Sequence, residues 1–123
     1  MLKITKNKIY LTRGDTAFIE VALTDQDGNP YIPTETDTVY FRLKQTAMSK
    51  VVLLEKIVER NVIEEGTSSV VQLLLELQED DTKDFKFTTY KYEVEVVTEN
   101  DYHFTAIENV DFEIGPELEL HNG

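Results

Sequence analysis

The chain has 123 residues, of which 41% are hydrophobic and none is cysteine, and its formal net charge is −12. This length and apolar fraction suit a single domain spanning residues 1–123 and exclude intrinsic disorder, and the lack of cysteine excludes disulfides, thiolate catalysis and thiolate metal sites. The acidic balance repels phosphate backbones, so we expect no nucleic-acid partner.

Along the chain, alternation of apolar and polar residues predicts strands rather than helices. It places apolar side chains on one face of a sheet and charged ones on the other, as antiparallel sheets with one solvent-exposed face require. The expected strands run over residues 9–12, 16–24, 39–44, 51–59, 71–77, 90–96, 103–106, 110–114 and 117–120. Polar turns are expected at 27–30 and 65–69, and a helical turn at 79–85. The pattern predicts an all-β fold, an immunoglobulin-like antiparallel β-sandwich of about eight strands.

Two segments bear on location. The lysines near the N-terminus are not followed by an apolar run, so the segment is not a signal peptide. The longest aliphatic run, residues 51–54, is far shorter than a membrane span. We therefore expect synthesis in the cytoplasm and no membrane partner.

Few residues have the arrangement that catalysis or metal binding requires. His103 and His121 have no second His or Cys at metal-ligand spacing, and no serine lies in a nucleophile motif. No Gly-rich phosphate loop occurs among the five glycines. The acids, including Glu93 and Glu95, are interpreted as solvated rather than as an acid/base couple. We expect no catalytic residue, no metal ligand and no cofactor, and hence no enzyme.

Two short motifs have both a functional and a structural interpretation. Residues 25–29 (DQDGN) resemble the opening of a calcium loop, but the twelve-residue ligand order is missing, and Asp-Gly forms a hairpin turn without metal. Residues 13–15 (RGD) spell a cell-adhesion tripeptide, but Gly14 and Asp15 suit a turn before the next strand. We interpret both motifs as turns.

Five segments follow one another in a characteristic order and spacing. They are 9–23 (IYLTRGDTAFIEVAL), 37–44 (DTVYFRLK), 81–82 (DT), 89–96 (TYKYEVEV) and 110–114 (VDFEI). In this order they resemble the N-terminal domain of phage upper baseplate proteins, which has a short strand, an R-G-D-T turn, a D-x-V-x-F-x-V-K strand, a D-T turn and a G-x-Y-x-Y-D-I-x-V strand.

The resemblance implies a non-catalytic structural protein of a phage or prophage tail or baseplate. Such a protein is located in the virion after synthesis in the cytoplasm of the bacterial host. Its partners would be other tail or baseplate proteins, or further copies of itself, bound through sheet edges. The sequence departs from the family pattern at Thr89, where the family usually has Gly.

Charge distribution suggests how copies would dock. Residues 1–50 hold seven Lys/Arg against six Asp/Glu, whereas residues 51–123 hold five against eighteen. A basic N-terminal strand (4–12) and an acidic C-terminal strand (114–120) predict head-to-tail contacts through sheet edges. The residues expected to bind partners are Lys3, Lys6, Lys8, Arg13, Tyr40, Glu117 and Glu119.

An alternative from another functional class is a carbohydrate-binding β-sandwich module. In that case Tyr40, Tyr90, Tyr92 or Tyr102 would stack against sugar rings. The chain has no Trp, so we place this alternative second.

Overall fold

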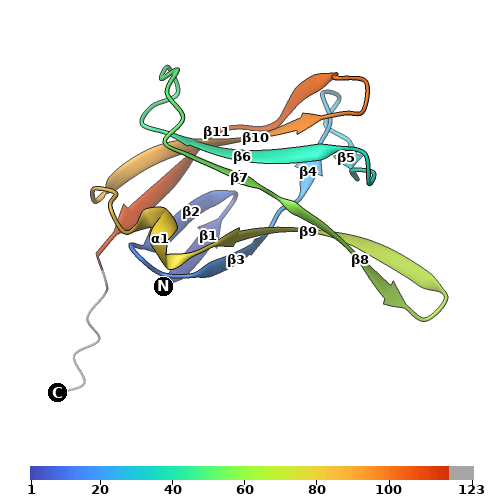
Figure 1. Cartoon of the computed structure of the whole chain (residues 1–123), viewed down its shortest axis with the longest axis horizontal. Helices are drawn as coiled ribbons and strands as arrows, with labels where there is room; N and C mark the ends of the chain where they lie inside the picture. The colour runs from blue at the N-terminus through green and yellow to red at the C-terminus, as the bar shows by residue number, and fades with distance from the viewer. Residues whose placement is uncertain (117–123) are drawn as a thin grey trace.

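Two β-sheets packed against each other enclose the hydrophobic core, so the protein is an all-β sandwich (Figure 1). The computed structural model describes residues 1–116, which contain eleven strands and one short helix. These elements are β1 (Leu2–Thr5), β2 (Lys8–Thr12), β3 (Ala17–Glu20), β4 (Leu23–Thr24), β5 (Pro30–Tyr31), β6 (Thr38–Lys44), β7 (Leu54–Ile57), β8 (Glu59–Glu65), β9 (Ser68–Leu77), α1 (Glu79–Thr82), β10 (Thr88–Val97) and β11 (His103–Gly115).

The larger sheet has six strands in the order β1-β2-β11-β10-β6-β7, and the smaller has three in the order β3-β9-β8. Strands β4 and β5 form a separate two-stranded ribbon. Every pair of neighbours is antiparallel except β2 and β11, which run parallel. The predicted β-sandwich is confirmed, with one parallel pair that was not expected. The immunoglobulin-like arrangement stays a prediction.

Alternate residues of both sheets meet in the core. The Phe41 ring centroid lies 5.3 Å from that of Tyr92 and 5.9 Å from that of Phe112. From the smaller sheet, Leu75 and Leu77 are buried in the same core. Full burial of one such side chain stabilises the fold by about 1.5–3 kcal/mol. The predicted apolar faces therefore form the core.

The predicted strand over 16–24 is two strands. β3 pairs with β9 as far as Glu20, and the N–H of Val21 still donates to the C=O of Leu73 at 2.9 Å. The chain then leaves the smaller sheet, and β4 pairs with β5 at Tyr31. Apolar alternation continues across the break because both pieces face the same core. Alternation alone therefore does not reveal the change of partner.

The predicted strands 103–106 and 110–114 are parts of one long strand, β11. Its register against β10 shifts twice, opposite residues 92–95, and Asn109 has a φ of 47°. Extra residues at such irregularities change the side-chain alternation. A single bulged strand therefore has the sequence pattern of two short ones.

Other predicted boundaries also move. The predicted strand 51–59 contains β7, and a second strand, β8, begins at Glu59. The N-terminal strand expected over 4–12 is a hairpin of β1 and β2. The expected helical turn is present as the short helix α1. The C-terminal strands predicted over 114–120 and 117–120 extend outside the described residues. Within residues 1–116, no helix is long and apolar enough to span a membrane.

Candidate docking surfaces

Ion pairs connect the central strands on the outer face of the larger sheet. Arg42 on β6 contacts both Glu55 on β7 and Glu95 on β10, with N–O distances of 2.7 Å in each case. Lys44 pairs with Glu93 across β6 and β10 at 2.9 Å. Glu93 and Glu95, interpreted from the sequence as solvated acids, are partly exposed and each is paired with a cation. This part of the face therefore presents little free charge to a partner. The interpretation of both acids as non-catalytic stays a prediction.

Two of the predicted partner-binding lysines, Lys3 and Lys8, lie near the β1 edge of the same outer face. They line a shallow groove of about 340 Å³ together with Asp111 and Glu113. A hydrogen bond from Lys91 lowers the pKa of Asp111, and the positive charges of Lys91 and Lys8 lower it further. The lysines thus belong to a rim of mixed charge.

Lys6, the third predicted lysine, forms the turn between β1 and β2 with Asn7. Their φ angles are 50° and 69°, which is typical of a two-residue type I′ turn. In such a hairpin the residues flanking the turn form a hydrogen-bonded pair, and every second residue does the same. The backbone N–H and C=O groups of Leu2 and Ile4 therefore point away from β2. Among residues 1–116, β1 is the terminal strand of the larger sheet and no described strand pairs with these groups, so they form an open edge within that part of the chain.

The other predicted partner residues do not join this cluster. The Arg13 guanidinium lies 4.1 Å from the ring centroid of Phe87, so its charge is engaged within the fold. Tyr40 lies on β6, four strands from β1 in the larger sheet, roughly 19 Å away. Glu117 and Glu119 lie outside the described residues.

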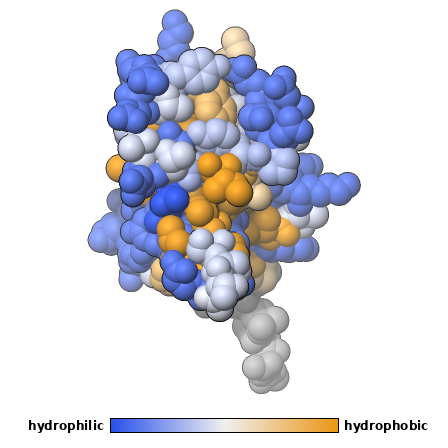
Figure 2. Space-filling view, turned by 90° about the vertical axis from the view of Figure 1, so that its right-hand side faces the viewer, coloured by the Kyte–Doolittle hydropathy of each residue, from blue (hydrophilic) through white to orange (hydrophobic). Residues whose placement is uncertain are grey.

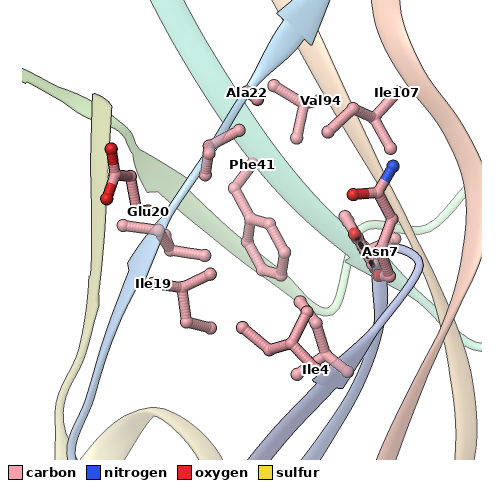
Figure 3. A pocket seen from close by; sticks show the side chains of 12 residues that line it. Ile4, Asn7, Ile19, Glu20, Ala22, Phe41, Val94 and Ile107 are labelled. Atoms are coloured by element: carbon pink, nitrogen blue, oxygen red, sulfur yellow. Dashed lines mark hydrogen bonds between the residues drawn. The ribbon is translucent and has the colours of Figure 1, made fainter. Parts of the chain in front are cut away.

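An apolar slot opens between the two sheets beside β1 (Figure 3). Its lining includes Ile4 of β1, Ile19 of β3, Phe41 of β6 and Ile107 of β11, and its volume is about 40 Å³. Ile4 is 46% exposed. The slot is large enough for the end of one aliphatic side chain, but ligand pockets for small molecules are about 300–1,000 Å³. It therefore fits a protein side chain better than a small ligand.

A hairpin arm, residues 61–72, is formed by the distal halves of β8 and β9 and projects from the sandwich (Figure 1). β3 pairs with β9 only over residues 74–77, so the distal part of β9 pairs with β8 alone. Val62 on one face, and Ile63 and Val70 on the other, are 47%, 39% and 48% exposed. The arm therefore presents apolar side chains on both faces.

The base of the arm continues this apolar surface. Val21, Tyr31, Ile32 and Val71 line a groove of about 210 Å³ beside β9, and Ile32 is 67% exposed. Figure 2 views the end of the molecule from which the arm projects and shows hydrophobic groups gathered within a hydrophilic surround.

Sequence reasoning missed the arm. Its signal is a pair of apolar doublets, Val62-Ile63 and Val70-Val71, on either side of a polar turn at Gly66. Doublets place apolar groups on both faces of a strand, whereas the alternation that marked the other strands places them on one.

Two of the four tyrosines proposed for sugar stacking are inaccessible, Tyr40 is partly buried and Tyr102 is exposed. Tyr90 and Tyr92 are 3% and 4% exposed, so the prediction that they are displayed is wrong. Side chains along β10 point alternately to the core and to the outer face, and Tyr90 and Tyr92 both occupy positions on the core face. Tyr102 is 55% exposed and its ring centroid lies 6.2 Å from that of Phe104.

The two predicted turn motifs have turn geometry. The Asp25 carboxylate accepts hydrogen bonds from the backbone N–H groups of Asp27 and Asn29, at 2.9 and 3.0 Å. Gly14 has a φ of 82° and its N–H donates to the Thr82 hydroxyl at 2.9 Å. No group of three or more His, Cys, Asp or Glu residues suited to a metal ion occurs within the part of the chain that the structure describes.

His103 lies beside two carboxylates at one end of β11. Its Nε2 is 2.9 Å from Asp101, and its Nδ1 is 3.6 Å from Glu95. The hydrogen bond to Asp101, supported by the negative charges of Asp101 and Glu95, raises the pKa of His103. The side chain is about half exposed. His121 lies outside the described residues.

Comparison of the chain with protein-family models, with curated proteins and with solved structures found no match.

Proposed function

We propose that this chain is a non-catalytic assembly module that binds protein partners through exposed sheet edges and the hairpin arm. The arm carries the proposal, because Val62, Ile63 and Val70 expose apolar surface on both faces of a two-stranded ribbon. An isolated two-stranded hairpin is only marginally stable in water, and large exposed apolar patches are typical of protein interaction sites. A protein partner would cover these side chains.

We further propose that the assembly is the tail or baseplate of a phage or prophage, so that the protein is located in the virion. The resemblance of residues 9–23, 37–44 and 89–96 to phage upper baseplate proteins supports this assignment. A structural role is consistent with the chemistry of the large sheet, where Glu93 and Glu95 are neutralised by Lys44 and Arg42 rather than free for proton transfer. Its partners would be other tail or baseplate proteins.

Affinity capture from lysate of phage-induced cells tests the proposal. Tagged wild-type protein is compared with a Val62→Ser/Val70→Ser arm variant and with Phe18→Ser, a control that changes another exposed apolar residue, on β3. We expect mass spectrometry to identify tail or baseplate proteins with the wild type and Phe18→Ser, and a clear loss with the arm variant. Capture of no virion protein from a virion-rich lysate would overturn the proposal.

One observation favours the carbohydrate-binding alternative. Tyr102 lines an open cleft of about 230 Å³ with Tyr31 and the acids Asp25 and Asp27. An exposed aromatic ring beside hydrogen-bonding carboxylates is suited to a sugar. Glycan binding that disappears in Tyr102→Ala, together with failure to capture virion proteins, would establish this alternative instead.

A further inference from the structure

The hairpin arm and the β1 edge have complementary charge on the same chain. Acids cluster near the turn of the arm, at Glu64 and Glu65, and lysines cluster at the β1 edge, at Lys3 and Lys6. The arm projects from one side of the molecule, well away from β1 (Figure 1). The two features therefore have to meet between copies rather than within one.

The backbone of the arm matches the open edge of β1. Gly66 and Thr67 form the turn of the arm, so the flanking pair of residues 65 and 68 is hydrogen-bonded, and every second residue along β8 repeats this. The N–H and C=O groups of Val62 and Glu64 therefore point away from β9. β8 is the terminal strand of the smaller sheet in the described part of the chain, so these groups form a second open edge there.

We propose that the hairpin arm of one copy docks antiparallel on β1 of a second copy and extends its six-stranded sheet. The outward backbone groups then pair Ile4 with Val62 and Leu2 with Glu64. Lys3 lies opposite Ile63 and diagonal to Glu65, within reach of a long side chain.

This register matches the side-chain chemistry of Val62 and Lys3, whereas Glu64 falls on the inner face opposite Leu2. Val62 falls on the inner face, where it covers Ile4 and the mouth of the apolar slot. Lys3 falls on the outer face beside Ile63, with Glu65 as its diagonal neighbour. The contact uses the arm of one copy and the β1 edge of the other, so it is heterologous. The first copy still has a free β1 edge and the second a free arm, and further copies can therefore add until the assembly closes into a ring or extends as a filament. The inference names a partner for the edge binding proposed above and rests on that function.

Cysteine cross-linking tests the register, because the wild-type chain has no cysteine. A Lys3→Cys variant is mixed with an Ile63→Cys variant and oxidised. Directly opposed residues of a non-hydrogen-bonded pair are about 4.5 Å apart at Cα, within the range of a disulfide. Val70→Cys, on the same face but one strand further from β1, is the matched control. We expect a cross-linked heterodimer with Ile63→Cys and little with Val70→Cys. Equal yields, or none with Ile63→Cys, would overturn the proposed register.

Sedimentation of the purified protein tests the contact itself. We expect self-association that Val62→Lys weakens by about ten- to a hundredfold, since it removes a buried aliphatic contact, while Phe18→Lys has little effect. Lys3→Glu should weaken association about two- to fivefold, and adding Glu65→Lys in the same chain should restore it. A wild type that stays monomeric at high concentration would overturn the inference. Capture of tail proteins by such a monomer would still support the proposed function.

Discussion

Tyr92 anchors the N-terminal hairpin to the core, so Tyr92→Phe is expected to loosen β1 and β2 without unpacking the sandwich. Its hydroxyl donates to the backbone C=O of Asn7 at 2.5 Å. Its ring lies against Phe41 and Phe112, with centroid distances of 5.3 and 6.2 Å. Phenylalanine keeps the ring contacts and removes only the hydrogen bond.

The expected loss follows from that difference. The bond to Asn7 is partly buried, and its loss lowers the free energy of unfolding by about 1–2 kcal/mol. For a domain of this size, that corresponds to a fall in Tm of roughly 4–8 °C. Tyr92→Ala also deletes the buried ring, so we expect a loss of about 3–5 kcal/mol.

Tyr92→Phe also changes how the free energy of unfolding depends on pH in alkaline solution. Burial raises the pKa of Tyr92 to about 12, whereas an exposed tyrosine ionises near 10. The neutral phenol is favoured in the folded state, so its contribution is fully present below about pH 10 and is lost as pH rises towards 12. We expect Tyr92→Phe to lose less stability than the wild type over this interval.

Urea denaturation at pH 7 and between pH 9 and 12, together with amide hydrogen exchange, measures these effects. Faster exchange in β1 and β2, with little change in β6, is the expected pattern. Two results would refute the reasoning. Unchanged stability and exchange would mean that the bond to Asn7 does not anchor the hairpin, and a loss as large as that of Tyr92→Ala would mean that the ring does not keep its packing.

Two further predictions concern other parts of the fold. Thr82 is fully buried and accepts the N–H of Gly14, so Thr82→Val should lower the free energy of unfolding by about 1–3 kcal/mol in chemical denaturation. Thr82→Ser should keep the bond, and equal losses in both variants would contradict this explanation. An NMR titration should place the pKa of His103 above its ordinary value, and Asp101→Asn should lower it. Stability from protonated His103 is present below pH about 6.5 and is lost as pH rises through the raised pKa, so no change in Asp101→Asn would refute the assigned cause.

The candidate site was predicted only in part. Lys3, Lys6 and Lys8 were expected to mark a basic edge, and they lie on β1, in the turn and on β2 of one hairpin, beside the acids Asp111 and Glu113. That they bind a partner stays a prediction. The local sequence was enough to predict that these lysines are near one another, because residues close in sequence stay close in space within a short hairpin. The arm was missed because its apolar doublets do not follow the alternation that marks a strand with one buried face.

Local sequence determined which face of each strand is buried. Phe41 and Phe112 face the core because side chains alternate along an extended backbone, and this holds whatever strand lies alongside. The same alternation put Tyr90 and Tyr92 inside, which the proposal of sugar stacking overlooked.

Only the tertiary structure decided which strands pair and where each sheet ends. Strand partners come from residues far apart in sequence, as in the parallel contact of β2 with β11. Hydrogen bonding between backbones is nearly independent of side-chain identity, so the sequence alone does not predict which strands pair. Within residues 1–116, the open edges at β1 and β8, and the exposure of Val62 and Ile4, follow from where those pairings stop.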